Sequence, residues 1–298
     1  MKLPFATLDV FTERRYAGNP LAVVFDADAL DGAAMQAIAR EFSHPETVFV
    51  LRPEQPGSTA RVRIFTPATE LAFAGHPTVG AALALALKGR SEGGKVLLEE
   101  KVGLIDCAVE ATASDRGRAR FRLPALPAPD GEAAESTAIA AALGLAPDDI
   151  GSNGFAPARW TLGNTFTFVP LRDIDAVRRC RINDRDWDKA FERGGRSFAF
   201  VFCRETVDPG SHFHARMFAP RAGVPEDPAT GSAAAAFAGL CAQALALEDG
   251  EHRLLIEQGY EMGRPSLIEL QITMRDGELA VASIGGPAII VTEGTIEA

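Results

Sequence analysis

Apolar positions along this chain fall mainly into short runs bounded by glycine, proline and polar residues. Runs of this kind, alternating with polar residues or continuously apolar, are typical of β-strands. They predict strands at residues 4–11, 20–25, 47–52, 59–65, 95–111, 198–203, 213–218, 254–258, 267–274 and 278–291. Capping signals predict two short helices, one at 31–42 with Asp31 as its N-cap and one at 137–145 that ends before Pro147.

Two longer stretches, about residues 77–88 and 228–246, are apolar nearly all round and predict buried helices. The second lies in a segment, Ala229 to Leu247, that carries no charge over a membrane-spanning length. Small and polar residues dominate that segment and leucine is sparse, so a helix buried in protein is favoured over a membrane span. A helix that is apolar on every side needs cover on every side, and we expect a curled sheet around each one.

The chain also repeats itself, which indicates a duplicated domain. Three pairs of segments match in the same order: 18–24 with 163–169, 63–67 with 216–220, and 76–82 with 227–233. The third pair opens the two apolar helices and aligns His76 with Asp227. Between the copies, residues 123–131 hold three prolines in a stiff extended connection.

These patterns predict an α+β fold of two pseudo-symmetric lobes, each a curled mixed β-sheet around a central helix. The N-terminal lobe is expected at 1–122, and the C-terminal tail, about 285–298, is expected to return to it. The C-terminal lobe is expected at 123–284.

Charge and cysteine content narrow the function. The 30 Lys and Arg residues against 40 Asp and Glu give a net charge of −10, which disfavours nucleic acid as a ligand. The four cysteines lie far apart and form no metal-binding or disulfide pattern, so a reducing compartment fits them best. The N-terminal residues lack the apolar stretch of a signal peptide. We therefore expect a cytoplasmic protein with no membrane contact.

Three side chains are candidates for acid/base chemistry. His76 and Asp227 are expected near the N-caps of the two apolar helices, where Pro77 and Pro228 suit the first turn and free N–H groups would bind a substrate carboxylate. Either side chain could simply cap its helix. Their matching positions favour a site built from both copies, and the helices are expected to begin at one shared cleft.

Glu46 is the third candidate because it directly precedes a predicted apolar strand. Burial beside Val48 and Phe49 would raise the pKa of its carboxyl toward the range of a general base. The matching residue of the second copy is Ser197, so one base stands where a symmetric enzyme would have two or none. A solvated glutamate at a strand start is the alternative.

Two other patterns are weaker. Residues 89–95 fit a phosphate-binding loop, but Val96 replaces the magnesium-binding hydroxyl and the segment follows a predicted helix instead of a strand. His212 and His214, with Cys203, could ligate zinc. The repeat aligns His214 with Arg61, which favours an ordinary polar strand face. We therefore expect no metal and no cofactor.

Together these motifs resemble the phenazine-biosynthesis PhzF family. The resemblance rests on five motifs in order along nearly the whole chain: Asp9-Val10-Phe11-Thr12 with Gly18-Asn19-Pro20, Glu46-Thr47, Gly75-His76-Pro77-Thr78, Glu226 to Ala233, and Glu261 to Ser266. It implies a diaminopimelate-epimerase-like fold, with the active site between two lobes, and a homodimer. The His44-Pro45 pair before Glu46 departs from the family pattern and bears on substrate choice.

The resemblance implies a cofactor-independent isomerase that moves a proton within a small unsaturated carboxylic acid. Glu46 would be the acid/base, His76 and Asp227 would contact the substrate, and Gly75, Gly231, Ser232 and Asn19 would help to bind it. Related epimerases carry cysteines at both helix starts, whereas the cysteines here lie outside those motifs. Two alternatives remain open: an amino-acid racemase or epimerase on the same fold, and a non-catalytic protein that binds small acids.

Overall fold

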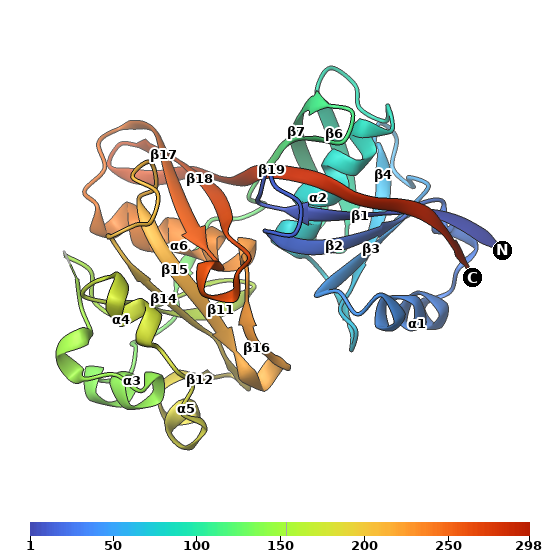
Figure 1. Cartoon of the computed structure of the whole chain (residues 1–298). Coiled ribbons are helices and arrows are strands. Elements are labelled where there is room, and N and C mark those ends of the chain that lie inside the picture. The colour runs from blue at the N-terminus through green and yellow to red at the C-terminus, as the bar shows by residue number, and fades with distance from the viewer. Residues whose placement is uncertain (153) are drawn as a thin grey trace. The chain divides into compact units, whose positions relative to one another are not determined.

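The computed structural model describes residues 1–152 and 154–298, which form two compact units. The first unit comprises Met1–Pro124 and Ser283–Ala298, and the second comprises Ala125–Ala282. Each unit contains one long apolar helix and a mixed sheet (Figure 1). This arrangement confirms the predicted α+β fold class.

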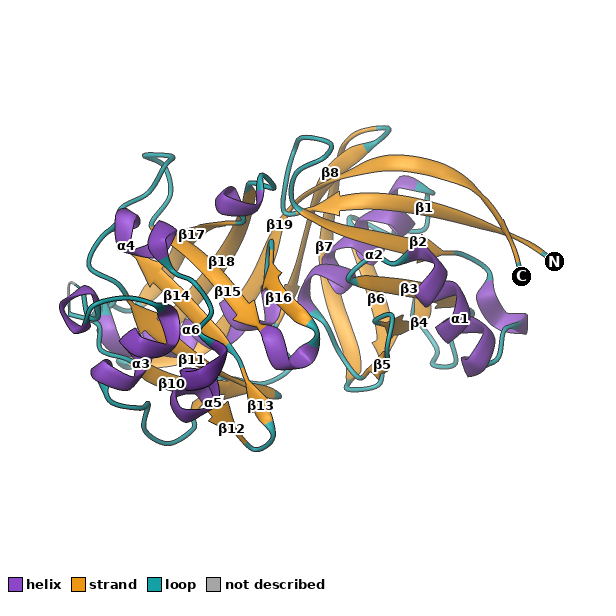
Figure 2. Cartoon of the chain, turned by 60° about the horizontal axis from the view of Figure 1, so that its bottom comes forward, coloured by secondary structure: helices purple, strands orange, loops and turns teal. Residues whose placement is uncertain are grey.

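In the first unit the strands pair in a ring. Its strands are β1 (Lys2–Val10), β2 (Asn19–Val24), β3 (Glu46–Leu51), β4 (Ala60–Phe65), β5 (Glu70–Leu71), β6 (Lys95–Glu100), β7 (Gly103–Ala113), β8 (Arg116–Arg122) and the end of β19 (Glu278–Glu297). Most neighbours are antiparallel, whereas β2–β3 and β4–β6 are parallel. The ring closes because β19 pairs with both β1 and β8. Figure 2 shows β1 and β19 running alongside each other toward the two chain ends.

Helix α2 (Gly75–Leu87) lies inside this ring and contacts strands on several sides. Its residues from Gly75 to Leu85 are all buried, which explains why the sequence is apolar on every face of the helix. Gly80 lets the helix approach the sheet, since a Cβ there would lie 2.4 Å from Leu21 and 2.9 Å from Val10. The helix predicted at 31–42 is α1 (Gly32–Phe42), and Asp31 caps it by accepting a hydrogen bond from the Ala34 N–H.

The second unit repeats the strand order of the first. Its strands are β9 (Ala128–Pro129), β10 (Ala158–Leu162), β11 (Asn164–Pro170), β12 (Glu192–Arg193), β13 (Arg196–Ser197), β14 (Ala199–Cys203), β15 (Phe213–Ala219), β16 (Val224–Asp227), β17 (Gly250–Gln258) and β18 (Ser266–Arg275). Here β11–β14 and β15–β17 are the parallel pairs, in the places of β2–β3 and β4–β6. The agreement of parallel and antiparallel pairs along both units confirms the duplication.

Three helices of the second unit pack outside its sheet: α3 (Ser136–Leu143), α4 (Ile174–Arg179) and α5 (Asp184–Phe191). They enclose a core that includes Trp187 and Phe191. Only α3 was predicted: α4 has six residues, and α5, although as long as α3 at eight residues, places its three buried residues among five charged ones. Short 3₁₀ turns occur at Ala27–Ala29, Pro147–Asp149, Pro220–Ala222 and Tyr260–Met262.

The segment 95–111, predicted as one strand, is an antiparallel hairpin of β6 and β7. The turn falls at Lys101-Val102, next to Gly103, whose φ of 123° is accessible to glycine. No helix in the described part of the chain combines the length and apolarity needed to cross a membrane.

Helix α6 (Gly231–Ala244) is the central helix of the second unit and packs against β10, β11 and β18. Gly239 faces the indole of Trp160 so closely that a Cβ would lie 2.2 Å from Cζ3 and 2.3 Å from Cε3. The indole ring of Trp160 is rigid and cannot move aside for an added methyl group, whereas the end of a flexible aliphatic side chain can. Gly239 is therefore required for the contact between helix and strand.

We expect Gly239→Ala to destabilise the second unit. Alanine would gain about 0.5–1 kcal/mol of helix propensity over glycine, but overpacking against Trp160 costs about 1–3 kcal/mol. Urea unfolding followed by tryptophan fluorescence would measure the loss. The double variant Gly239→Ala/Trp160→Leu removes the ring, and it should regain stability relative to Trp160→Leu alone. Equal stability of Gly239→Ala and the parent protein would contradict this account.

Candidate active site

Glu46 and His76 meet inside the first unit. Glu46 is the first residue of β3, and His76 is the second residue of α2. Their side chains are 17% and 6% exposed, and Glu46 Oε2 lies 3.2 Å from His76 Nε2. Two residues thirty positions apart, each singled out from a different motif, thus form one contact at the start of a buried helix.

His76 is neutral in this setting. Burial lowers the pKa of the imidazole to about 3, against the opposing effect of a hydrogen bond to the backbone of Pro20. Asn19, which precedes Pro20 as the first residue of β2, is fully buried. Gly75 is the first residue of α2. The first unit therefore gathers four of the predicted residues around one helix start: Asn19, Glu46, Gly75 and His76.

The other three predicted residues lie in the second unit. Asp227 ends β16, and Gly231 and Ser232 are the first two residues of α6. Thr230 is the N-cap of α6, and its hydroxyl donates to Asp227 Oδ2 at 2.5 Å. The N–H groups of the first turn have no acceptor within the helix, so this helix start can bind an anion.

Asp227, which was expected near the N-cap of its helix, lies three residues before the N-cap Thr230, and it does not match His76. The helix starts align Gly75 with Gly231, which places His76 opposite Ser232. Asp227, like Leu71, is the last strand residue before the helix. Pro228 likewise precedes α6 instead of lying in its first turn. In this register the His-Pro and Asp-Pro dipeptides are offset by five residues.

A bidentate ion pair in each unit supports the corrected alignment. Arg63 Nε and Nη2 donate to the two carboxylate oxygens of Glu70, at 2.7 and 2.9 Å. Arg216 contacts Glu226 in the same way, at 2.8 and 2.9 Å. Arg63 holds the pKa of Glu70 down at about 2, so this carboxylate is ionised. Each pair ties the strand before the central helix to its neighbour and so fixes the helix start.

Sequence reasoning missed these pairs, although a signal was available. Glu70-Leu71-Ala72-Phe73-Ala74-Gly75 and Glu226-Asp227-Pro228-Ala229-Thr230-Gly231 share a glutamate five residues before the helix glycine. Arg63 and Arg216 lie in the matched segments 63–67 and 216–220. Aligning Glu70 with Glu226 as well gives the register of the structure, in which Gly75 matches Gly231.

The counterpart of Glu46 also changes. Thr47 pairs with Phe65, and Ala199 pairs with Phe218, so the strand register matches Glu46 with Phe198 and not with Ser197. The second unit still has no acid/base side chain at the position of Glu46, because neither Phe198 nor Ser197 is a base.

His214 is not on an ordinary polar strand face. It is fully buried in β15, where Nδ1 lies 2.7 Å from Glu257 Oε1 and Nε2 lies 2.9 Å from Glu261 Oε1. Burial alone would lower the pKa of His214, but the two carboxylates outweigh it and raise the pKa. Within 1–152 and 154–298, no cluster of three or more His, Cys, Asp or Glu side chains is arranged to hold a metal ion.

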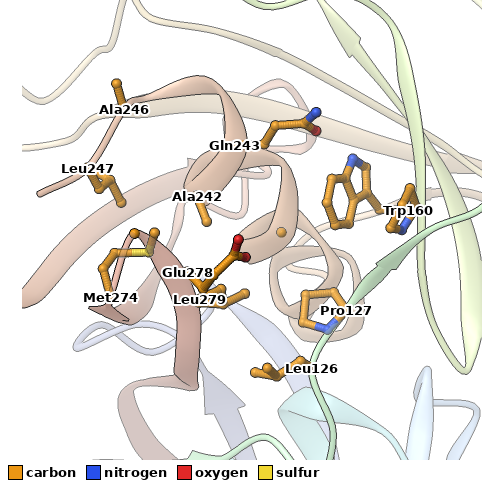
Figure 3. Close-up of a pocket in the computed structure, with 13 residues that line it drawn as sticks. Leu126, Pro127, Trp160, Ala242, Gln243, Ala246, Leu247, Met274, Glu278 and Leu279 are labelled. Atoms are coloured by element: carbon orange, nitrogen blue, oxygen red, sulfur yellow. The ribbon is translucent and has the colours of Figure 1, made fainter. Parts of the chain in front are cut away.

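A pocket of about 640 Å³ lies in the second unit, and none of the predicted site residues is among those that line it (Figure 3). It is lined near the C-terminal end of α6 by Trp160, Gln243, Met274 and Glu278, among others, whereas Asp227 and Ser232 are at the opposite end of the helix. The candidate site residues therefore do not line this pocket.

Known proteins resemble this chain over nearly its whole length. A family model described as "Phenazine biosynthesis-like protein" matches residues 8–294. The chain is 50% identical over 292 residues to an uncharacterized isomerase of Mesorhizobium japonicum, covering 97% of this chain and 96% of that one. It is 34% identical over 291 residues to the trans-2,3-dihydro-3-hydroxyanthranilate isomerase of Pseudomonas aeruginosa, covering 97% and 98%.

A solved structure shows the same fold. The PhzF-family phenazine biosynthesis protein of Bacillus anthracis superposes with a TM-score of 0.90 at 27% identity, covering 100% of both chains. The fold and the named relatives together define an isomerase. The chain belongs to the phenazine biosynthesis-like family, PhzC-PhzF.

Proposed function

We propose that the chain moves a proton between carbon atoms of a small unsaturated carboxylic acid without a cofactor, and that Glu46 is the acid/base. The observation that carries this proposal is the buried contact of 3.2 Å between Glu46 Oε2 and His76 Nε2. The substrate class is a cyclic dihydro acid, by analogy with the named dihydrohydroxyanthranilate isomerase at 34% identity.

A neutral His76 suits the return of the proton. In a neutral imidazole one nitrogen carries hydrogen and the other has a lone pair. We infer that the N–H donates to the Pro20 carbonyl and that the Nε2 lone pair faces Glu46. Once Glu46 has taken a proton from carbon, its carboxyl O–H can donate to Nε2. An imidazole whose pKa is about 3 does not keep that proton, so Glu46 retains it for delivery.

The reaction needs no oxidant or reductant, because the electron pair stays within the substrate and a proton is returned to it. Glu46 removes a C–H proton, the electron pair moves into the conjugated system, the double bond shifts, and the proton returns to a different carbon. We assign polar substrate contacts to Asp227 and carboxylate binding to the helix starts at Gly75 and at Gly231-Ser232. Backbone N–H groups and the positive end of the helix dipole favour an anion at such positions.

The test is turnover of trans-2,3-dihydro-3-hydroxyanthranilate in deuterium oxide by the purified chain. The expected result is a change in ultraviolet absorbance, with one solvent-derived deuterium at the newly protonated carbon in at least part of the product. Absence of turnover would reject this substrate. If related dihydro acids also show no turnover, the isomerase proposal fails as well. Loss of optical rotation without an absorbance change would instead indicate a racemase.

A further inference from the structure

Glu100 is a buried carboxyl group beside the start of α2. It is the last residue of β6 and is 8% exposed. Its Oε1 lies 2.7 Å from the hydroxyl oxygen of Thr78, which is two residues after His76 in the first turn of the helix. Its Oε2 is buried and has no hydrogen-bond partner among the described residues.

Hydrogen counting around Thr78 shows which form of Glu100 fits. Thr78 Oγ1 lies 2.7 Å from Glu100 Oε1 and also 2.7 Å from the carbonyl oxygen of Ala74. A hydroxyl has one hydrogen, and a carbonyl oxygen can only accept. If the hydroxyl donates to Ala74, as threonines in helices commonly do, the second short contact needs a hydrogen from Glu100. An ionised Glu100 would leave two acceptors competing for one hydrogen.

The second unit holds an amide at the equivalent position. Glu99 accepts hydrogen bonds from the N–H groups of Glu54 and Gln55, and Glu257 accepts them from those of Val207 and Asp208. The two glutamates therefore match, and the next residue along each strand is Glu100 or Gln258.

Gln258 holds the start of α6. Its amide Nε2 donates to Thr230 Oγ1 at 3.0 Å and to the Asp227 carbonyl at 2.7 Å, and its Oε1 accepts from the Thr230 N–H at 3.1 Å. One unit thus uses a side chain that is a donor at any ordinary pH. The other unit uses a side chain that is a donor only when protonated.

We propose that Glu100 is a positioning residue that acts as a neutral carboxylic acid, donating to Thr78 and thereby fixing the first turn of α2 and the place of His76 against Glu46. Its effect on turnover rests on the proposed function, whereas its protonation state can be tested without it. Burying the partnerless Oε2 of Glu100 also costs far less free energy when the group is a neutral carboxylic acid than when it is a carboxylate.

The electrostatic surroundings agree. Burial raises the pKa of Glu100 to about 8, although the contact with Thr78 opposes that rise. On β7, burial raises the pKa of the Cys107 thiol, so it stays protonated, and Asp106 is exposed to solvent. His76 on α2 is neutral, and Arg61 of β4 pairs with Glu54.

The protonation state can be measured directly. Infrared spectra of the parent protein should contain the carbonyl stretch of a protonated carboxyl group that is missing in Glu100→Gln at pH 6. That band should titrate with a midpoint near pH 8, the value expected from burial. A difference spectrum that shows an ionised carboxylate at pH 6 would overturn the proposal, whether or not the chain turns over any substrate.

The positioning role is tested by three variants in the isomerase assay. Glu100→Gln keeps a donor and should retain kcat within a few-fold, whereas Glu100→Leu removes it and should lower kcat by about 10- to 100-fold, as small misplacements of reacting groups do. Glu99→Gln is the matched control on the same strand and should leave kcat unchanged. Equal rates for Glu100→Gln and Glu100→Leu would overturn the positioning role.

A second pair of variants covers the case in which Glu100→Leu does not fold. Thr78→Ser keeps the hydroxyl and should behave like the parent protein, whereas Thr78→Val removes the acceptor. Thr78→Val should lower kcat by about 10- to 100-fold, as Glu100→Leu is expected to. Equal kcat values for Thr78→Val and Thr78→Ser would contradict the positioning role.

Discussion

Glu46→Gln is expected to lower kcat for the proton shift by about 10²- to 10⁴-fold, the range that a positioned acid/base contributes. Glutamine has the same size and can donate to His76 Nε2, so the 3.2 Å contact at the start of α2 is kept while basicity is lost. The thermal midpoint should therefore change little. Turnover of trans-2,3-dihydro-3-hydroxyanthranilate and deuterium incorporation should fall together.

Glu41→Gln is a suitable control, because Glu41 is an exposed residue of α1 close in sequence. It should behave like the parent protein in both measurements. Unchanged turnover in Glu46→Gln would show that a different group moves the proton, and the assignment of Glu46 would then be rejected.

Glu257→Ala is expected to destabilise the second unit by about 3–5 kcal/mol, the usual result of removing one partner from a buried ion pair. Glu257 is fully buried and contacts His214 Nδ1 at 2.7 Å as well as the N–H groups of Val207 and Asp208. Its removal leaves a buried imidazolium with Glu261 as its remaining partner in the ion pair and two N–H groups without their acceptor. Urea unfolding at pH 6 would measure the loss.

The pH dependence of the stability of Glu257→Ala shows whether the loss comes from the positive charge on His214. The pKa of His214 is raised in the folded protein, so its ion pairs contribute stability below the ordinary histidine value near 6.5. That contribution is lost as the pH rises through the higher folded value. The gap between the parent protein and Glu257→Ala should therefore narrow at alkaline pH. Glu99→Ala is the control, because Glu99 accepts hydrogen bonds from backbone N–H groups but contacts no histidine among the residues that the structure describes. It should lose less stability than Glu257→Ala, and its difference from the parent protein should not shrink at alkaline pH.

Several features could be predicted because local physics decides them. Asp31 has the short polar side chain that caps a helix, and it does so. The two apolar helices were predicted within a few residues, since a segment apolar on every side has to be buried. Glu46 and His76 were chosen from separate motifs, and the structure brings them into contact. Their roles in catalysis stay predictions.

Other features depend on tertiary contacts that leave a weak trace in the sequence. Strand β8 was missed because two of its three buried residues, Gly117 and Ala119, are small and give little apolar signal: a Cβ on Gly117 would lie 2.8 Å from Leu83 of α2. Glu99 and Glu100 look like solvated charges at the end of a strand, yet both are buried, one against a loop and the other against a helix. His214 is buried as well, because two carboxylates distant in sequence compensate its charge.

The long strand β19 has a consequence for biosynthesis. The chain leaves the ribosome from its N-terminus, so β1 and β8 emerge well before the residues after Ser283 that pair with both. Until then the first unit is an open sheet with two unpaired edges, which are sites where nascent chains stick to one another. The second unit, whose own strands are translated in the interval, can complete its internal pairings earlier. The ring around Glu46 and His76 therefore closes only after the whole second unit has been translated, and chaperones can act on the open sheet until then.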